Sequence, residues 1–157
     1  GLAGLKLCSY LYNEYHKDFI TVMPTNLYGP NDNYDLDNSH VLAALINKIT
    51  YAKKYNKESI EIWGTGKPKR DFIHVNDIVN AVQVMMNNTF RGVIDVGTGV
   101  SNKLVDIADY FKIDYKSVIG GETERIDNTA DTSILNKFGW RAKINLYDYI
   151  EQNKVVN

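Results

Sequence analysis

The sequence predicts an α/β protein, and three observations carry that prediction. Apolar residues recur at helical spacing over residues 2–16 and again from Val41 to Ile49. Runs that suit strands, Phe19–Met23 and Ser59–Trp63, stand between such helical segments. Glycine and proline mark the turns that separate them. This alternation favours a layered structure whose strands pair in parallel or mixed fashion.

Size and composition favour one compact unit over residues 1–157, because 44% of the 157 residues are hydrophobic. The net charge of −1 gives no bulk electrostatic reason to bind nucleic acid or an acidic membrane. The one cysteine, Cys8, excludes an internal disulfide and fits a reducing compartment. We see neither a signal peptide nor an apolar run long enough to span a bilayer, so we expect a cytoplasmic protein.

The remaining elements follow from periodicity and turn residues. The helix that starts near Val41 should run to about residue 55, where lysines suit its carboxyl end. Beyond the turn at Gly64–Gly66, we expect a strand at 71–75, a helix at about 77–87 with Ile78, Val79, Val82 and Met85 facing inward, a strand at 92–96, a helix at 102–111, a strand near 117–119, a short helix at 133–137 and a last helix at 146–154.

The stretch from Met23 to Asn33 is the first candidate for a functional site. It contains Pro24, Gly29 and Pro30, so we expect the chain to leave the sheet there and to cross open space as a loop. Loops that leave strand ends are where binding and catalytic groups gather. His40 should then sit at the start of the next helix, which Asn38 or Ser39 is able to cap.

Three longer stretches act as motifs: MPTNLYGPNDN followed by NSH, then WGTGKPKRDFIHVND, and then VGTGV. Together they resemble the GDP-L-fucose synthases of the extended short-chain dehydrogenase/reductase family. The resemblance covers essentially the whole chain but only about the second half of that family. It implies the C-terminal, substrate-binding part of a Rossmann-like fold. It also implies an enzyme that epimerises C3 and C5 of a GDP-4-keto-6-deoxyhexose and reduces C4 with NADPH.

The resemblance also implies that the reductase machinery is incomplete in this chain. The family's Tyr-x-x-x-Lys pair would place its lysine at Gly1 and its tyrosine before the first residue. The Gly-rich phosphate loop is absent too, because Gly97-Thr98-Gly99 is followed by Asn102 where a third glycine is needed. We therefore expect Gly97–Gly99 to be a tight turn, NADPH to be bound mostly by an absent N-terminal half, and this chain alone to be inactive.

His40 is the candidate catalytic acid. At the first turn of a helix the dipole disfavours imidazolium, which suits a proton donor, and the family uses this position to reprotonate carbon beside the C4 ketone. The resemblance also places Pro24, Leu27 and His40 near the nicotinamide, and Asn26 and Val41 near the substrate. The alternatives are a surface or capping histidine and a loop of plain turn formers. Cys8 lies on an apolar helical stripe and should pack there, so it is not the family's missing cysteine base.

Arg70 is the candidate diphosphate ligand, since its guanidinium fork suits phosphate oxygens and the family uses an arginine there. Lys48 stands where these synthases usually carry a second arginine, and it keeps the charge but not the fork. Arg125 lies where the wider family places another basic residue. Trp63 resembles a tryptophan that lines the pocket. The alternatives are solvated charges for both Lys48 and Arg125 and edge-strand packing for Trp63.

No metal site is expected. His74 and Asp77 lie at a strand end and a helix start, where capping explains both. By resemblance, residues 2–15 belong to a two-fold dimer contact, so we expect a homodimer. Two rival hypotheses stay open: another nucleotide-sugar epimerase or reductase of the same family, and a truncated, non-catalytic chain that binds a nucleotide sugar or pairs with a partner.

Overall fold

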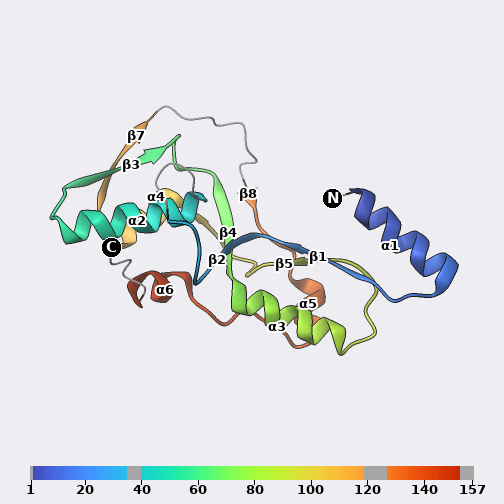
Figure 1. Cartoon of the computed structure of the whole chain (residues 1–157). Helices are drawn as coiled ribbons and strands as arrows, with labels where there is room; N and C mark the ends of the chain where they lie inside the picture. Colours follow the sequence, from blue (N-terminus) through green and yellow to red (C-terminus); the bar gives the residue numbers. More distant parts are fainter. Residues whose placement is uncertain (1, 35–39, 119–126, 153–157) are drawn as a thin grey trace.

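Helices and strands alternate along the chain in the computed structural model, which describes residues 2–34, 40–118 and 127–152 (Figure 1). The elements are α1 (Leu2–Tyr15), β1 (Ile20–Pro24), β2 (Asn26–Tyr28), α2 (Val41–Lys54), β3 (Ser59–Trp63), β4 (Lys69–His74), α3 (Val75–Met86), β5 (Gly92–Val96), β6 (Ser101–Lys103), α4 (Leu104–Tyr110), β7 (Asp114–Val118), β8 (Asp127–Asn128), α5 (Ser133–Lys137) and α6 (Leu146–Gln152). The α/β prediction is confirmed.

The strands pair in three groups, mostly in parallel. β1 pairs with β5, and β3 pairs with β7, in each case in parallel. β4 is the centre of the third group, because it pairs in parallel with β2 and β8 and antiparallel with β6. The mixed pairing expected from the sequence is therefore present, and β4 is the strand that joins distant segments of the chain.

Two apolar cores lie on either side of β4. One core gathers side chains of α2, β3, α4 and α6 around Phe72. The other gathers side chains of α3, β5 and α5 around Ile73. Phe72 and Ile73 are consecutive residues of one strand, so their side chains point to opposite faces. β4 thus carries the boundary between both cores, as its central place in Figure 1 suggests.

The predicted elements agree with the structure to within a few residues, with three differences. The loop after Pro24 does not cross open space at once, because β2 pairs with β4. The helix expected from Asn102 begins at Leu104, since Ser101–Lys103 forms β6. Val79, expected to face inward, is 56% exposed, whereas Ala81 of the same helix is buried. Three-residue strands give too short a pattern to be predicted from alternation.

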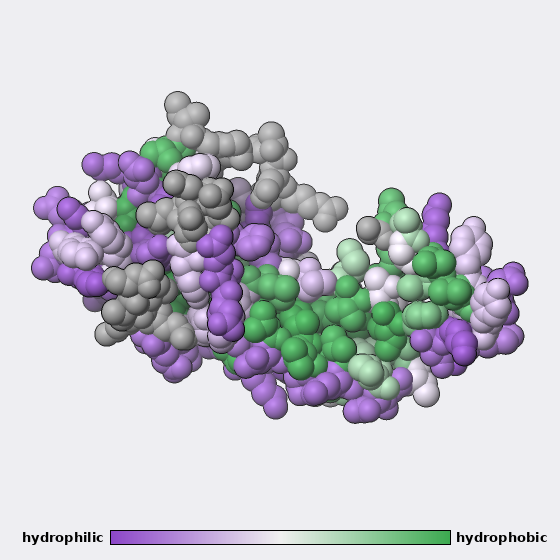
Figure 2. Space-filling model, viewed as in Figure 1, coloured by the Kyte–Doolittle hydropathy of each residue, from purple (hydrophilic) through white to green (hydrophobic). Residues whose placement is uncertain are grey.

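Helix α1 lies at one end of the molecule and buries none of its residues in this chain (Figure 1). Its exposed side chains include Leu2, Leu7 and Tyr10. Figure 2 shows hydrophobic residues gathered over the middle of the molecule and onto α1. Cys8 is only half-buried, so the packing predicted for it is partial. An apolar helix with no buried residue is typical of a surface that another segment or chain covers.

A search of the described ranges 2–34, 40–118 and 127–152 finds no helix that is both long and apolar enough to cross a membrane.

Candidate functional site

A groove with a cavity volume of about 590 Å³ lies beside β4. One wall is the segment Thr25–Asp32, which includes β2, and a second is the start of α2 at His40–Leu42. Arg70, Phe72 and Val75 form the third. Arg70 and Phe72 alternate along β4 and therefore face the same side of the strand. Segments far apart in sequence meet here because β2 pairs with β4 and α2 packs in the same apolar core as Phe72 of β4.

Local chemistry explains how β2 reaches β4. The side-chain amide of Asn26 donates to the backbone carbonyl of Asp71 at 3.3 Å, and the backbone of Thr25 donates to the carbonyl of Val96 at 3.0 Å. Gly29 then lets the chain pass close to α3, because a Cβ at this position would lie 2.6 Å from a methyl carbon of Val75. The wall of the groove is thus fixed by backbone hydrogen bonds and one glycine.

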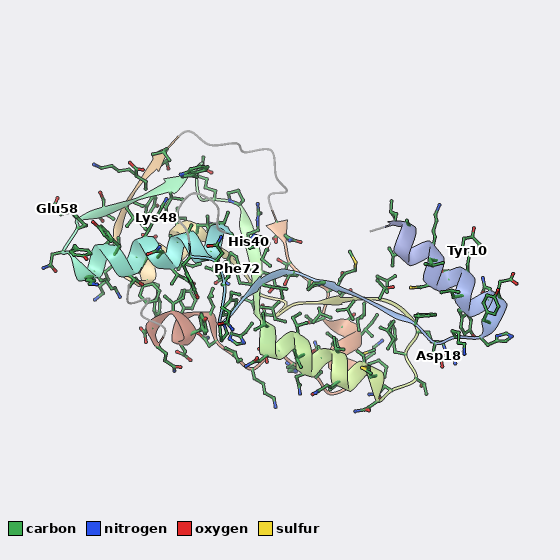
Figure 3. All side chains as sticks on the ribbon, viewed as in Figure 1. Tyr10, Asp18, His40, Lys48, Glu58 and Phe72 are labelled. Atoms are coloured by element: carbon green, nitrogen blue, oxygen red, sulfur yellow. The ribbon has the colours of Figure 1, made fainter. Side chains whose placement is uncertain are left out.

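His40 is the N-cap residue of α2 and lines the groove (Figure 3). Its backbone is extended, and its carbonyl accepts a hydrogen bond from the amide of Ala44 at 3.0 Å. Its side chain is exposed and makes no capping hydrogen bond. The predicted position at the helix start is confirmed, whereas the capping role suggested for Asn38 or Ser39 falls outside the described residues. An imidazole so placed can exchange a proton with a ligand in the groove.

Arg70 is half-buried in β4 and lines the same groove. Its Nη1 donates to the backbone carbonyl of Lys69 at 3.1 Å, which directs the guanidinium along the strand. Lys67 and Lys69 are exposed beside it. The groove therefore combines a guanidinium fork, the amide of Asn26 and an imidazole, a set of groups that suits an anionic, polar ligand.

The groove gathers some of the predicted residues and leaves others outside it. Asn26, Leu27, Val41 and Arg70 line it together with His40.

Among the residues left outside, Pro24 ends β1 and is exposed. Lys48 lies further along α2, and its Nζ donates to the carbonyl of Glu61 at 2.9 Å (Figure 3). Trp63 is 67% exposed at the end of β3 and does not line this groove. Arg125 lies outside the described residues.

Sequence reasoning missed Asp71, which is fully buried beside the groove. Its two carboxylate oxygens accept hydrogen bonds from the backbone amides of Thr98 (3.0 Å), Gly99 (2.9 Å) and Ala130 (3.2 Å), and from the Thr98 hydroxyl (2.6 Å). The available signal in the sequence was a carboxylate, Asp71, placed directly before the apolar pair Phe72-Ile73. Its partners lie 27 to 59 residues away, so no local pattern predicts them.

The turn at Gly97–Gly99 is a structural turn, as the sequence predicted. The amides of Thr98 and Gly99 donate to Asp71 and therefore do not face a phosphate site. A Cβ at Gly97 would lie 2.5 Å from a carboxylate oxygen of Asp71 and 2.6 Å from the Cβ of Ala130. Only glycine allows so close an approach, which explains this glycine without a ligand.

Three aromatic rings pack behind the groove, those of Tyr28, His74 and Tyr149, with ring centroids 5.0 to 5.2 Å apart. Burial raises the pKa of Tyr28 well above its usual range, and the charge of Asp77 adds to the effect. Burial also raises the pKa of Tyr149, which shares a hydrogen bond with the Tyr34 hydroxyl. Both phenols therefore stay protonated and support the groove wall rather than act as bases.

His74 and Asp77 are structural, as predicted, although only His74 acts as a cap. Nδ1 of His74 accepts from the amide of Asn76 at 3.1 Å. Asp77 instead accepts from the amides of Lys143 and Ile144, at 3.1 and 3.0 Å. Within the described part of the chain, no cluster of three or more histidine, cysteine and carboxylate side chains is arranged to hold a metal ion.

A second hollow of about 500 Å³ lies between α1 and the β1–β5 pair. Arg91 closes one end, because it contacts Asp18 at 2.7 Å and donates to the Tyr12 hydroxyl at 3.0 Å. The hollow is lined by Lys6, Cys8, Phe19 and Arg91 among others, and none of the predicted site residues is among its described lining residues. We therefore take the groove beside β4 as the functional site.

Comparisons with known proteins agree with the geometry. Residues 2–97 match the model of the NAD dependent epimerase/dehydratase family. A putative GDP-L-fucose synthase 2 from Arabidopsis thaliana is 36% identical over 96% of this chain and 48% of its own length. The GDP-L-fucose synthase of Escherichia coli strain K12 is 35% identical over 92% of this chain and 50% of its own length. The resemblance drawn from the motifs is thereby confirmed.

Solved structures share the fold. A GDP-mannoheptose C4 reductase from Campylobacter jejuni, solved with NADP bound, superposes on 98% of this chain and 56% of its own chain with a TM-score of 0.81 and 28% identity. The chain spans about half the length of the curated relatives it matches. Because the family model covers more than half of this chain, the chain belongs to the NAD-dependent epimerase/dehydratase family.

Proposed function

We propose that this chain is the C-terminal, substrate-binding portion of an NADPH-dependent GDP-4-keto-6-deoxyhexose 3,5-epimerase/4-reductase of the GDP-L-fucose synthase type. The observation that carries the proposal is the groove that joins Asn26, His40 and Arg70 from three distant segments. Relatives named GDP-L-fucose synthase, 35 to 36% identical to this chain, support the same substrate class. The substrate portion takes in residues 1–157 as one unit.

Arg70 holds the diphosphate of the nucleotide sugar in this proposal. A guanidinium presents two parallel N–H donors to phosphate oxygens, and the half-buried setting of Arg70 limits screening by water. Lys48 contributes little, because its ammonium already bonds to the Glu61 carbonyl. Asn26 and Val41 border the part of the groove that takes the sugar. Trp63 and Arg125 stay proposed contacts on the family resemblance alone, because Trp63 does not line the groove and Arg125 lies outside the described residues.

His40 acts as the proton donor in epimerisation. The carbons beside a 4-keto group lose protons readily because the ketone stabilises the resulting enolate, and inversion requires a proton from the opposite face. The exposed position of His40 among the residues that line the groove supports this role. The base that first removes a proton belongs to the part of the relatives' length that this chain does not span. His40 thus serves one half of a two-residue step.

NADP is the cofactor in this proposal, and it supplies the hydride that reduces C4. Leu27 and Pro24 would border the nicotinamide end. The fit rests on Thr25, whose buried hydroxyl has no hydrogen-bond partner within the described residues and which lines the groove, so a polar group from outside would complete this wall. The phosphates of NADP would be bound by another segment of protein, because the amides of the Gly97–Gly99 turn already donate to Asp71.

Self-association through α1 completes the proposal, in a cytoplasmic enzyme that acts on small nucleotide sugars. Support comes from the exposed apolar side chains of α1, since its outward face carries Leu7 and Tyr10. A second candidate function is reduction without epimerisation, favoured by the likeness to a GDP-mannoheptose C4 reductase. Incorporation of solvent deuterium at C3 and C5 of the product distinguishes the two functions, because only epimerisation exchanges those protons.

The experiment is a calorimetric titration of GDP into the folded chain and three variants. We expect Arg70→Ala to weaken binding roughly 10- to 100-fold, the effect of losing one charge-assisted contact of about 1.5 to 3 kcal/mol. Lys48→Ala should change the dissociation constant less than about threefold, because its ammonium bonds to a carbonyl. His40→Ala should leave GDP binding intact, since a proton donor to the sugar does not touch the nucleotide. Equal losses in the Arg70 and Lys48 variants would contradict the diphosphate assignment.

A further inference from the structure

We propose that Asp71 is a positioning residue that holds Arg70 in its ligand-binding orientation. The proposal rests on the function proposed above and adds a residue to that site. Asp71 directly precedes Phe72 and follows Arg70 in β4, so its side chain points to the opposite face of the strand from both. Arg70 and Phe72 face the groove, and the buried side chain of Asp71 makes its hydrogen bonds on the opposite face of the strand.

Four donors converge on this one carboxylate. Oδ1 accepts from the amide and the hydroxyl of Thr98, and Oδ2 accepts from the amides of Gly99 and Ala130. The donors belong to two segments, the turn between β5 and β6 and the segment after β8. A carboxylate that accepts several amide hydrogen bonds holds them more strongly than a neutral group does. Asp71 therefore ties β4 to both of these segments.

The same residue also fixes the opposite wall of the groove. Its backbone carbonyl accepts the side-chain amide of Asn26 at 3.3 Å, which ties β2 to β4. The registers agree with this role, because Arg70 lies opposite Asn102 of β6 and Asn128 of β8. Release of the carboxylate would loosen both neighbours of Arg70 at once. Arg70 would then sample more orientations. A ligand would have to restrict these orientations on binding, which costs free energy and weakens the affinity.

The close packing around Asp71 argues that this arrangement is specific. The side chain is fully buried, and a Cβ on Gly97 would collide with it at 2.5 Å. Asp71→Asn keeps the shape but replaces one acceptor oxygen with an amide group that donates. In either orientation of the new side chain, at least one backbone N–H donor would then face another donor, because only the Thr98 hydroxyl among the four can also accept. Both pairs of bonds cannot survive, whichever way the new side chain turns.

A matched control lies six residues away. Asp77 is also buried and also accepts two backbone amides, those of Lys143 and Ile144, but these amides precede α6 and do not belong to the segments that adjoin Arg70. Asp77→Asn removes the same charge from the same region without touching the neighbours of Arg70. If removal of a buried carboxylate only disturbs the structure, both variants should lose order at Arg70 and affinity for GDP. If Asp71 positions Arg70, only Asp71→Asn should show these losses.

The first readout needs no ligand. Nuclear magnetic relaxation of the Arg70 Nε–H group reports how far the guanidinium moves on the picosecond-to-nanosecond timescale. We expect its order parameter to fall in Asp71→Asn and to stay at the wild-type value in Asp77→Asn. An unchanged order parameter in a folded Asp71→Asn variant overturns the proposal. If Asp71→Asn does not fold, Thr98→Val removes one donor to the carboxylate and should lower the order parameter, while Thr98→Ser should restore it.

The second readout is the dissociation constant for GDP in a double-mutant cycle. Asp71→Asn should weaken binding roughly tenfold in the wild-type background and less than about twofold when Arg70→Ala is already present. Equal losses in both backgrounds would show that Asp71 does not act through Arg70 and would overturn the proposal. Absence of GDP binding by the wild-type chain would instead count against the proposed function, and the relaxation measurement would still decide the role of Asp71.

Discussion

Two buried carboxylates, six residues apart in the sequence, illustrate how single residues shape this site. Asp71 accepts from Thr98, Gly99 and Ala130, whereas Asp77 accepts from Lys143 and Ile144. Each joins the β4–α3 junction to a later segment of the chain that has little regular structure. Backbone amides in such segments need partners when they are buried, and a carboxylate provides several at once.

His74 is the residue for which a change of pH has a defined consequence. It is 4% exposed, and its Nδ1 accepts from the Asn76 amide, so the neutral imidazole is the form that fits. Burial lowers the pKa of His74, and the charge of Asp77 opposes the shift in part. A folded pKa below the unfolded value near 6.5 means that the unfolded chain takes up a proton first as the pH falls.

We therefore expect the free energy of unfolding to fall as the pH drops below about 6.5, by up to about 1.4 kcal/mol per pH unit from this one group. The contribution of the neutral His74 to the free energy of unfolding is fully present above that pH and decreases as the pH falls below it. Urea unfolding at pH 7.5, 6.5 and 5.5 measures the effect. His74→Asn keeps a side-chain acceptor for the helix cap but cannot titrate, so it should flatten this part of the profile.

His16→Asn provides the control for that experiment, because His16 is exposed and its replacement leaves the buried imidazole in place. Its profile should retain the acid slope of the wild-type chain. A slope that disappears in His16→Asn, or that persists unchanged in His74→Asn, would contradict the role given to His74.

At this scale the sequence predicted the residues whose chemistry is visible in a local motif. His40 and Arg70 stood out through a helix start and a basic turn together with the family motifs, whereas Asn26 stood out through the family motifs alone. Asp71 did not stand out, because its hydrogen-bond partners come together only on folding. Thr25 did not stand out, because only the folded structure shows that its buried hydroxyl has no partner within the described residues. Lys48 shows the reverse case, since its charge was noted but its bond to Glu61 belongs to the tertiary structure.

At the scale of elements, β4 organises the chain. It pairs with three strands and divides two cores, although it is only six residues long. The longer helices were predicted to within about two residues because their apolar periodicity extends over several turns, as in α1 and α2. β2, β6 and β8 escaped prediction because two or three residues cannot show an alternation. The exposure of Val79 on α3 likewise depends on which side of the helix meets the sheet.

Helix α1 gives the prediction that belongs to this scale. Its outward face carries Leu7, which is 57% exposed, and a glutamate there would place a charge in any apolar contact between two copies. We expect sedimentation equilibrium to show a concentration-dependent dimer for the wild-type chain and a monomer for Leu7→Glu. Melting should stay near the wild-type temperature, because the replaced side chain is not buried.

Val79→Glu is the matched control for the α1 experiment, since it also places a glutamate at an exposed apolar position. This variant should dimerise like the wild-type chain. A wild-type chain that stays monomeric over the whole concentration range, or a dimer that survives Leu7→Glu, would count against association through α1.

At the scale of the molecule, the β1–β5 pair has one covered face and one exposed face. Ile94 and Val96 are buried beneath α3 and α5, whereas Met23 and Val93 are exposed on the other side. Parallel strands are usually covered on both faces. This face is left uncovered in the described part of the chain, and Figure 2 shows a hydrophobic surface over the middle of the molecule.

The fold class could be predicted from the sequence because alternation of helical and strand patterns is a property of the whole chain. The arrangement of the strands could not, since three short groups joined through β4 depend on long-range pairing. The groove was predicted only in part, because its wall from Thr25 to Asp32 was expected as a free loop and is held by β2. Function was predictable chiefly through motifs rather than through composition or charge.

The measurement that tests the central claim most directly is a ¹H–¹⁵N spectrum of the isotope-labelled chain during titration with GDP, with UDP as the control. We expect saturable shifts that concentrate on the amides of Arg70 and its neighbours in β4, with weaker effects of UDP. This result would locate the nucleotide in the groove beside β4. Shifts confined to the hollow between α1 and β5, or none in a folded chain, would contradict the assignment of the groove as the nucleotide-sugar site.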